Sequence, residues 1–310
     1  MTLPSLIIMS LAISMTLGQT PPPTHQPHVK QRIVMTWVPP YGVDASLMQL
    51  NTTFGDKGMK DGLTHLALQF WTPTANGDLR RVDKYGAITD STIATLRNWG
   101  KEHHVRVMLC VYNGMAGWDW PLARAAFAAH RETFVKALVA EARRLNLDGV
   151  DIDLEGEDSK VPNLNNDHLS FIQFVKALSK DLHAQGKDLT VDSFSYIWNA
   201  PNQGWWQSLL PLVDGLTSMG YAELGAQAGE WRAYKAQQQA AGTNAYKLLI
   251  GMPTGKSNWQ GNTAREQLLW VHDNGIVGVA LWDAQLKDAA WTTDDMWTML
   301  QQIREQGAKP

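Results

Sequence analysis

After residue 30, short runs of apolar and β-branched residues alternate with longer segments in which apolar residues recur every three or four positions. The short runs predict buried strands, and the longer segments predict amphipathic helices. We expect strands at Ile33–Val38, Leu63–Phe70, Val105–Tyr112, Gly149–Glu155, Leu189–Phe194, Gly215–Met219, Leu248–Met252 and Ile276–Leu281. We expect helices at Thr89–His103, Ala123–Leu145, Asp167–Gln185, Gly229–Ala241, Thr263–Asn274 and Thr293–Gln306, with short helices around Asp44–Leu50 and Trp205–Leu210.

This alternation of strands and helices predicts parallel βαβ units. Eight such units that close on themselves form a single (β/α)8 barrel, which we place at residues 31–310. An open, doubly wound sheet is the structural alternative. No G-x-G-x-x-G or P-loop pattern follows the first predicted strand, so the sequence favours the barrel.

The amino-terminal segment predicts export from the cytoplasm. An apolar stretch, Leu3–Leu17, is followed by Gly18, which is typical of a secretory signal peptide over residues 1–18. No Lys or Arg precedes Lys30, so an uncleaved membrane anchor is the alternative. Residues 19–30 contain four prolines and predict an extended linker. Nothing later approaches the roughly 18 continuous apolar residues of a spanning helix. We therefore expect a mature protein that is secreted or periplasmic, with no membrane partner.

Composition and charge narrow the classes of partner. The chain has 27 Lys and Arg against 30 Asp and Glu, a net charge of −3, which argues against nucleic acid. Hydrophobic residues make up 44% of the chain, which is enough for a large core. The single cysteine, Cys110, excludes an intrachain disulfide framework and a cysteine-clustered metal site. We expect a monomer that uses no cofactor.

Three acids at alternate positions distinguish the fourth predicted strand. In the run Asp148–Glu155, single apolar residues separate Asp151, Asp153 and Glu155. Side chains alternate across a strand, so these three share one face, with neighbouring Cα atoms about 6–7 Å apart. Ionising all three carboxyl groups at this spacing costs free energy, because their negative charges repel one another. At least one of them should therefore hold a proton near neutral pH. A protonated acid at the open end of a barrel strand is what a general acid requires.

Two other interpretations of these acids are weaker. Solvated acids at a strand end would explain Glu155 and Asp153, but not three acids that run back into the strand. The Asp-x-Asp-x-Glu spacing offers oxygen ligands for a divalent cation, but no His lies nearby to complete a transition-metal set. We therefore expect acid catalysis and no metal.

The run Asp148–Glu155 resembles the DxxDxDxE signature of family 18 glycoside hydrolases, the chitinases and endo-β-N-acetylglucosaminidases. The resemblance implies that Glu155 donates a proton to the glycosidic oxygen. It also implies that Asp153 orients the substrate's acetamido group and stabilises the positive charge that develops there, while Asp151 tunes Asp153. Asp148 is then a structural residue at the strand entrance.

The same resemblance implies substrate-assisted retaining catalysis, in which the carbonyl oxygen of the sugar's own 2-acetamido group is the nucleophile. Met219 and Tyr221 resemble the family's Met-x-Tyr element, whose tyrosine bonds the acetamide oxygen. Trp282 resembles the tryptophan that forms the floor of the sugar site. Ala222 replaces an acid that often follows the tyrosine, and Val111–Gly114 replaces the family's Ser-x-Gly-Gly signature. These departures leave the exact glycan open.

Tryptophan placement gives an independent indication of a sugar site, because sugar rings stack their C–H faces on flat indole rings. Of 14 tryptophans, nine follow or end predicted strands, on the face where a barrel builds its active site: Trp37, Trp71, Trp118, Trp120, Trp198, Trp205, Trp206, Trp259 and Trp282. We expect Trp205 or Trp206 to be a hydrophobic lid. The expected substrate-binding residues are Trp37, Trp71, Trp118, Trp198, Met219, Trp259 and Trp282. Asp192 and Tyr196 are further plausible contacts.

The sequence therefore predicts a secreted, chitinase-type glycosidase that cleaves β-1,4 bonds next to N-acetylglucosamine. Its partner would be a polysaccharide or glycan that contains N-acetylglucosamine, such as chitin or chito-oligosaccharides. An endo-β-N-acetylglucosaminidase acting on N-glycans, or a peptidoglycan hydrolase, is the alternative. A non-catalytic, glycan-binding barrel is a second alternative, but loss of activity usually shows as replacement of the glutamate, and Glu155 is present.

Overall fold

The computed structural model describes residues 31–86, 88–157, 164–193, 199–200, 202–219, 231–255, 258–259 and 262–308. The expected signal peptide and linker, residues 1–18 and 19–30, lie outside the described residues and stay predictions. Among the described residues, no helix is both long enough and apolar enough to cross a membrane.

Eight parallel strands form a closed barrel. They are β1 (Val34–Val38), β4 (His65–Pro73), β6 (Arg106–Tyr112), β7 (Gly149–Asp153), β9 (Asp188–Ser193), β11 (Gly215–Ser218), β12 (Leu248–Pro253) and β15 (Gly278–Trp282). Neighbours in the ring follow chain order, and β1 pairs in parallel with both β15 and β4, which closes it. Strand β5 (Leu79–Arg81) pairs antiparallel with the end of β4. The prediction of a single (β/α)8 barrel is confirmed.

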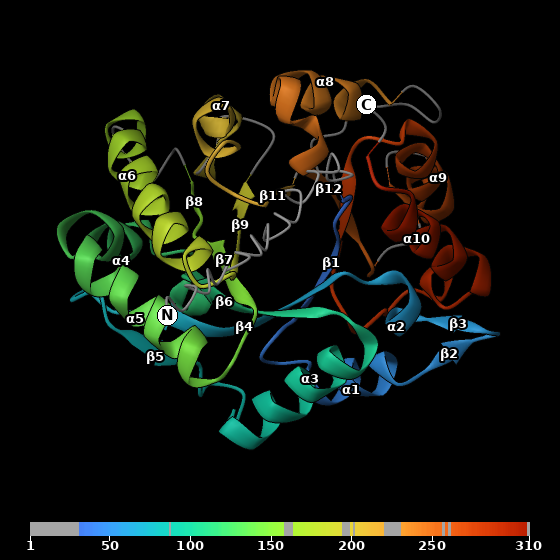
Figure 1. The fold of residues 1–310 in the computed structure, drawn as a ribbon, viewed down its shortest axis with the longest axis horizontal. Helices are drawn as coiled ribbons and strands as arrows, with labels where there is room; N and C mark the ends of the chain where they lie inside the picture. Colours follow the sequence, from blue (N-terminus) through green and yellow to red (C-terminus); the bar gives the residue numbers. More distant parts are fainter. Residues whose placement is uncertain are drawn as a thin grey trace, which may run out of the picture.

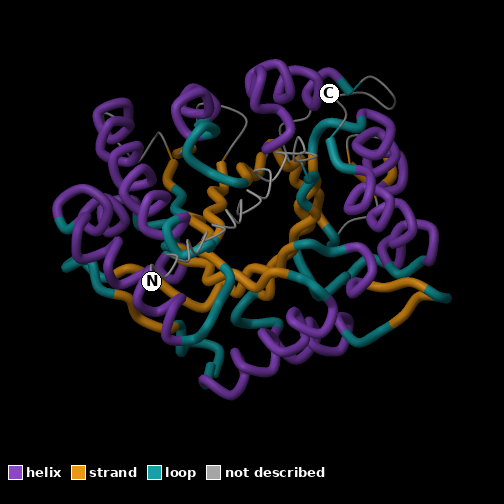
Figure 2. Tube along the Cα trace, viewed as in Figure 1, coloured by secondary structure: helices purple, strands orange, loops and turns teal. Residues whose placement is uncertain are grey.

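Helices surround this ring of strands (Figures 1 and 2). They are α1 (Val43–Leu50), α2 (Met59–Gly62), α3 (Asp90–His103), α4 (Trp120–Arg124), α5 (Arg131–Arg144), α6 (Leu164–His183), α7 (Trp206–Leu209), α8 (Arg232–Ala241), α9 (Ala264–Asn274) and α10 (Asp294–Gln306). Short antiparallel pairs lie outside the barrel: β2 (Thr53–Phe54) with β3 (Lys57–Gly58), β8 (Gly156–Glu157) with β10 (Asn199–Ala200), and β13 (Asn258–Trp259) with β14 (Asn262–Thr263).

The expectation of one continuous helix over Ala123–Leu145 is wrong. Helix α4 ends at Arg124, a π-helical turn follows at Ala125–Ala129, and α5 begins only at Arg131. The widened turn is closed by a hydrogen bond from the His130 amide to the Ala125 carbonyl, at 3.0 Å. An apolar periodicity that continues through both helices does not reveal such a one-residue insertion.

Two apolar layers pack on the two faces of the barrel strands. The interior layer consists of Ile33, Met35, Trp37, Ala67, Met108, Cys110, Leu249 and Ala280, with Trp282 packed against it. The larger layer lies between the strands and the helices, and in β7 it receives Val150 and Ile152. Because side chains alternate along a strand, the same strand directs Asp151 and Asp153 into the barrel interior, where both are buried.

Gly149 allows β7 to enter the barrel between its neighbours. A Cβ atom at this position would lie 2.3 Å from the Asp188 carbonyl oxygen and 2.5 Å from Cε of Met108. A backbone oxygen within a parallel ladder cannot move aside without disturbing the pairing of β7 with β9. The absence of a side chain at Gly149 is therefore a packing requirement of the strand that carries the acids.

We expect Gly149→Ala to lower the free energy of unfolding by about 1–3 kcal/mol, because the added methyl group overpacks the β7–β9 contact. Gly255→Ala is the matched control, since no atom lies within 4 Å of the Cβ it would add. Denaturant unfolding of both variants measures the difference. Equal stability of the two would contradict the packing argument.

Candidate active site

A cavity of about 190 Å³ lies at the carboxyl ends of the barrel strands. The described residues that line it are Trp37, Trp118, Asp153, Glu155, Asp192, Met219 and Trp282. They come from β1, β7, β9 and β15 or from the segments that follow β6, β7 and β11. In a (β/α)8 barrel this is the end at which active sites form.

Asp151 lies deepest of the acids in the motif and is completely buried. Its Oδ2 accepts a hydrogen bond from Nε1 of Trp37 at 2.9 Å, and its Oδ1 accepts one from the Thr190 hydroxyl at 2.5 Å. Burial raises the pKa of Asp151, while the hydrogen bonds from Thr190 and Trp37 oppose that rise. Two donors thus hold this carboxyl in one orientation beneath Asp153.

Asp153 is 2% exposed and faces the cavity. Its Oδ2 accepts a hydrogen bond from Nε2 of Gln69 at 2.7 Å, whereas its Oδ1 makes no hydrogen bond of good geometry among the described residues. Burial and then the charge of Asp151 raise the pKa of Asp153 to about 7. One oxygen is therefore fixed by Gln69, and the carboxyl group also interacts with the side chain of Glu155.

Glu155 follows β7 directly and is held by its backbone. Its amide donates to Oδ1 of Asn113 at 2.8 Å, and its carbonyl accepts from Nδ2 of the same asparagine at 2.7 Å. These two hydrogen bonds to Asn113, at the end of β6, fix the main chain of Glu155 and leave its side chain at the cavity. Burial, reinforced by the charge of Asp153, raises the pKa of Glu155 well above its usual value, so this carboxyl keeps its proton toward neutral pH.

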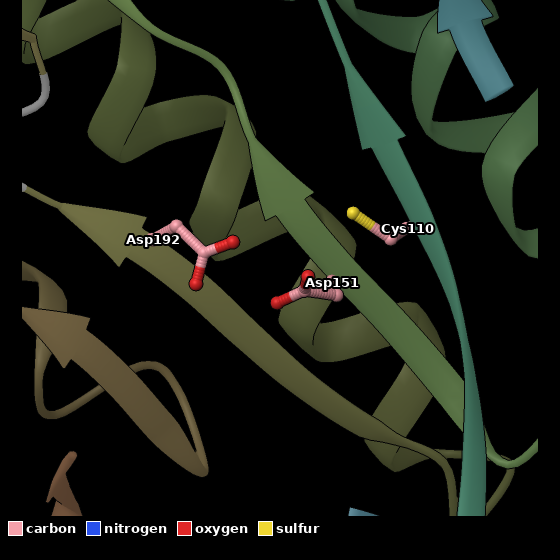
Figure 3. A group of neighbouring side chains, drawn as sticks. All are labelled: Cys110, Asp151 and Asp192. Carbon is pink, nitrogen blue, oxygen red and sulfur yellow. The ribbon is translucent and has the colours of Figure 1, made fainter. Parts of the chain in front are cut away.

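Asp192, Asp151 and Cys110 form a cluster on three neighbouring strands (Figure 3). One potential ligand atom of each lies within 4.8 Å of the others, and all three residues are buried. Burial raises the pKa of the Cys110 thiol well above its usual value, so the sulfur stays protonated. Both oxygens of Asp151 already accept hydrogen bonds. A soft, protonated thiol beside two carboxyls does not match the all-oxygen set that Mg²⁺ or Ca²⁺ prefers, so this cluster fits shared protons better than a cation.

Three of the predicted tryptophans line the cavity. Trp37 and Trp282 have ring centroids 5.7 Å apart at an interplanar angle of 55°, so they form two differently inclined walls. Trp118 is 38% exposed, which places it at the cavity mouth. Trp37 also donates to Asp151, so the same ring orients an acid and lines the cavity. Met219, which is 8% exposed, completes the apolar part of the lining.

The structure does not bring Trp71 to this cavity. Along β4, Gln69 pairs with Cys110 but Trp71 pairs with Val111, so a β-bulge lies between them. The bulge breaks the alternation and turns Trp71 to the outer core, where its Nε1 donates to Glu141 of α5 at 3.3 Å. Sequence alternation alone would have placed Trp71 on the same face as Gln69.

The other predicted residues lie elsewhere or are not described. Asp148 stands at the opposite end of β7, where its Oδ2 accepts the Val107 amide at 2.8 Å, as suits a structural residue. Trp205 and Trp206 are buried away from the cavity lining. Tyr196, Trp198 and Tyr221, as well as the side chain of Trp259, lie outside the described part of the structure. Their roles stay predictions.

Gln69, Asn113 and Thr190 position the three acids, and the sequence patterns did not predict this role for any of them. Each is a polar residue within or just after a predicted strand, and that was the available signal. A lone polar residue in a strand has many explanations, and only the structure pairs each one with a particular acid.

The arrangement can hold a ring between aromatic walls and present two carboxyls of different character to it. The raised pKa of Glu155 suits this carboxyl to proton donation, and Oδ1 of Asp153 makes no hydrogen bond of good geometry among the described residues. Such a pair can protonate a leaving oxygen and stabilise a neighbouring positive charge. This chemistry is typical of glycosidic bond cleavage.

Comparison with solved structures supports the fold. A chitinase from Chromobacterium violaceum ATCC 12472 is 17% identical, with a TM-score of 0.65 over 88% of this chain and 98% of that chain. The Ostrinia furnacalis Group IV chitinase in complex with allosamidin is 14% identical, with a TM-score of 0.62 over 88% of this chain and 97% of that one. The Bacillus cereus spore cortex-lytic enzyme SleL is 14% identical, with a TM-score of 0.62 over 90% of this chain and 77% of that one.

No curated protein matches the sequence. The structural likenesses are too distant in sequence to show more than the fold. The family comparison goes further, because the match to "Glycosyl hydrolases family 18" extends over residues 41–298, which is most of the chain. The chain therefore belongs to glycosyl hydrolase family 18.

Proposed function

We propose that this protein hydrolyses β-1,4 bonds next to N-acetylglucosamine, in chitin or chito-oligosaccharides, with retention at the anomeric carbon. The observation that supports this most strongly is the pairing, in one aromatic-walled cavity, of Glu155 with Asp153. Glu155 has a raised pKa, and Oδ1 of Asp153 makes no hydrogen bond of good geometry among the described residues. The two carboxyls are thus prepared for different tasks.

In the first step, Glu155 gives its proton to the glycosidic oxygen, and the bond from that oxygen to the anomeric carbon breaks. The carbonyl oxygen of the sugar's 2-acetamido group attacks the same carbon and forms a cyclic oxazolinium ion. Asp153 accepts the acetamide N–H on Oδ1 and offsets the positive charge. In the second step, water attacks the anomeric carbon, Glu155 takes the water proton, and the acetamide is regenerated.

The protein prepares this step before substrate binds. The hydrogen bond from Gln69 orients Asp153, and the charge of Asp151 raises its pKa. Asn113 fixes the backbone of Glu155. Donors and acids that are already in place need no reorganisation when charge develops. The tryptophan walls supply stacking surface for the sugar ring.

A second candidate substrate is a bacterial wall glycan such as peptidoglycan, because one similar structure is a spore cortex-lytic enzyme. An endo-acting enzyme on N-glycans would use the same chemistry, since it needs only an N-acetylated sugar beside the scissile bond. The presence of Glu155 supports an enzyme over a non-catalytic, glycan-binding barrel. We also propose that the protein acts outside the cytoplasm, on the grounds of the apolar segment over residues 1–18.

We expect Glu155→Gln to lower turnover of chitotetraose by about 10²–10⁴-fold, because an amide of the same shape cannot donate the proton. Binding of the oligosaccharide and the melting temperature should change little. Glu305→Gln on the outer helix α10 is the control and should keep full activity. Near-normal turnover by Glu155→Gln would remove Glu155 from the mechanism.

The pH profile should report the coupling of the two acids. The protonated form of Glu155 is the active one, so kcat/KM falls as the pH rises through its pKa. Because the charge of Asp153 contributes to the raised pKa of Glu155, the Asp153→Asn variant should lower that pKa and move the alkaline limb to lower pH. The residual activity of this variant, measured from pH 4 to pH 10, provides the test. An alkaline limb at the same pH in both proteins would show that the ionisation of Glu155 is not coupled to Asp153.

The acetamide group should be indispensable. A fully de-N-acetylated oligosaccharide lacks the nucleophile, so we expect no hydrolysis of it under conditions that cleave the acetylated one. A thiazoline analogue of the oxazolinium ion should bind far more tightly than the parent sugar, because it resembles the intermediate. Equal cleavage of both oligosaccharides, with no effect of the thiazoline, would indicate an ordinary carboxylate nucleophile.

A further inference from the structure

Asp192 is a buried cavity residue to which the proposed mechanism gives no role. It lies near the carboxyl end of β9, is 1% exposed, and lines the same cavity as Asp153 and Glu155. Neither of its carboxyl oxygens makes a hydrogen bond of good geometry among the described residues, although the Thr217 hydroxyl and the Asp151 carboxyl lie beside it. Buried polar atoms are normally hydrogen-bonded, so two oxygens without a well-formed hydrogen bond on one side chain need a physical reason.

The other buried acids in the described part of the chain each accept at least one well-formed hydrogen bond. Asp151 receives hydrogen bonds on both oxygens. Asp167 receives two on Oδ2, from Nε1 of Trp120 at 2.8 Å and Nε of Arg124 at 2.9 Å. The half-buried Asp188, on the same strand as Asp192 but at the opposite end of the barrel, contacts His65 and Arg106. The fold therefore satisfies its structural acids, and Asp192 differs from them in opening onto the cavity.

The position of Asp192 complements that of Asp153. The ladder between β7 and β9 ends with the pair Ile152 and Val191, so the next residues, Asp153 and Asp192, continue the two strands at the same level. Both line the cavity, and each has at least one oxygen that makes no well-formed hydrogen bond among the described residues. Two acids on adjacent strands can contact two different groups of one bound ring and so fix its rotation against the tryptophan walls.

We propose that Asp192 binds the substrate sugar directly, through a hydrogen bond between its carboxyl group and a hydroxyl or amide group of the sugar held in the cavity. This inference rests on the proposed function, because it takes the cavity to be the site of the N-acetylated sugar. Asp192 is thus a binding residue that orients the ring for proton transfer from Glu155. The substrate supplies the well-formed hydrogen bond that the surrounding side chains do not.

The protonation state of Asp192 suits a sugar. Burial, reinforced by the charges of Asp151 and Asp153, raises the pKa of Asp192 well above its usual value. A neutral carboxylic acid can donate through its O–H and accept through its carbonyl oxygen, and sugar hydroxyls also do both. The titratable groups packed around it are Asp151, Asp153 and Glu155 on the β7 side and Cys110 beyond them.

The test measures the affinity of chitotetraose by calorimetry in the Glu155→Gln background, where no hydrolysis occurs. Adding Asp192→Ala should weaken binding by about 5- to 100-fold, the range expected when a buried hydrogen bond to a ligand is lost. Adding Asp188→Asn instead is the matched control: an acid of the same strand is changed at the far end of the barrel. This second variant should bind chitotetraose with unchanged affinity.

Thermal unfolding separates binding from structure. Asp188→Asn breaks contacts with His65 and Arg106 and should lower the melting temperature. Asp192→Ala removes a carboxyl that makes no well-formed hydrogen bond among the described residues, so its melting temperature should stay equal or rise. Unchanged affinity in Asp192→Ala, or an affinity loss equal to that of Asp188→Asn, would overturn the inference. If Glu155→Gln alone does not bind chitotetraose, the proposed function fails, and the inference falls with it.

Discussion

The constraint on which the site depends is the burial of several carboxyl groups inside one barrel. Asp151, Asp153 and Asp192 are each almost fully buried, and Glu155 stands just above them. Burial disfavours the charged form of each acid, and every acid that does ionise makes its neighbours harder to ionise. Burial raises the pKa of each of the four, and the charges of neighbouring acids add to the rise for Asp153, Glu155 and Asp192, so protons are shared within the group. A general acid that works near neutral pH follows from this geometry.

The surrounding residues decide which acid holds which role. Asp151 accepts hydrogen bonds from Trp37 and Thr190, and these bonds oppose the rise of its pKa. Asp153 accepts one hydrogen bond, through Oδ2, while the side chain of Glu155 stands at the cavity on a clamped backbone. The number of hydrogen-bond donors to the carboxyl groups falls from Asp151 to Asp153 to Glu155. In the proposed mechanism, this difference separates charge stabilisation by Asp153 from proton donation by Glu155.

Local periodicity was sufficient to predict the barrel and the shared face of the acids. The barrel follows from the alternation of strands with helices along the chain, and the shared face follows from the alternation of side chains along one strand. Local periodicity was not sufficient for Trp71, since a β-bulge in β4 reverses the alternation. The contacts of Gln69 and Asn113 join strands that are distant in sequence, and their pairing depends on the register of the closed ring. The π-helical turn at Ala125–Ala129 could not be predicted from the apolar pattern either, because one inserted residue leaves that pattern intact on both sides. Tyr221, the remaining residue predicted to be catalytic, lies outside the described residues.

The same acids also act on stability, in a direction set by their pKa shifts. Burial, then the charge of Asp151, raises the pKa of Asp153 from 3.8 to about 7 in the folded chain. Between those values the folded state binds more protons than the unfolded state, so this group's contribution to stability is complete at low pH and is lost as the pH rises toward 7. Glu141 works in the opposite sense, because its hydrogen bonds from Arg144 lower its pKa, and its contribution is lost as the pH falls. Near neutral pH, the clustered acids of the candidate active site therefore lower the free energy of unfolding. Burial of the apolar layer between the strands and the helices must offset this loss.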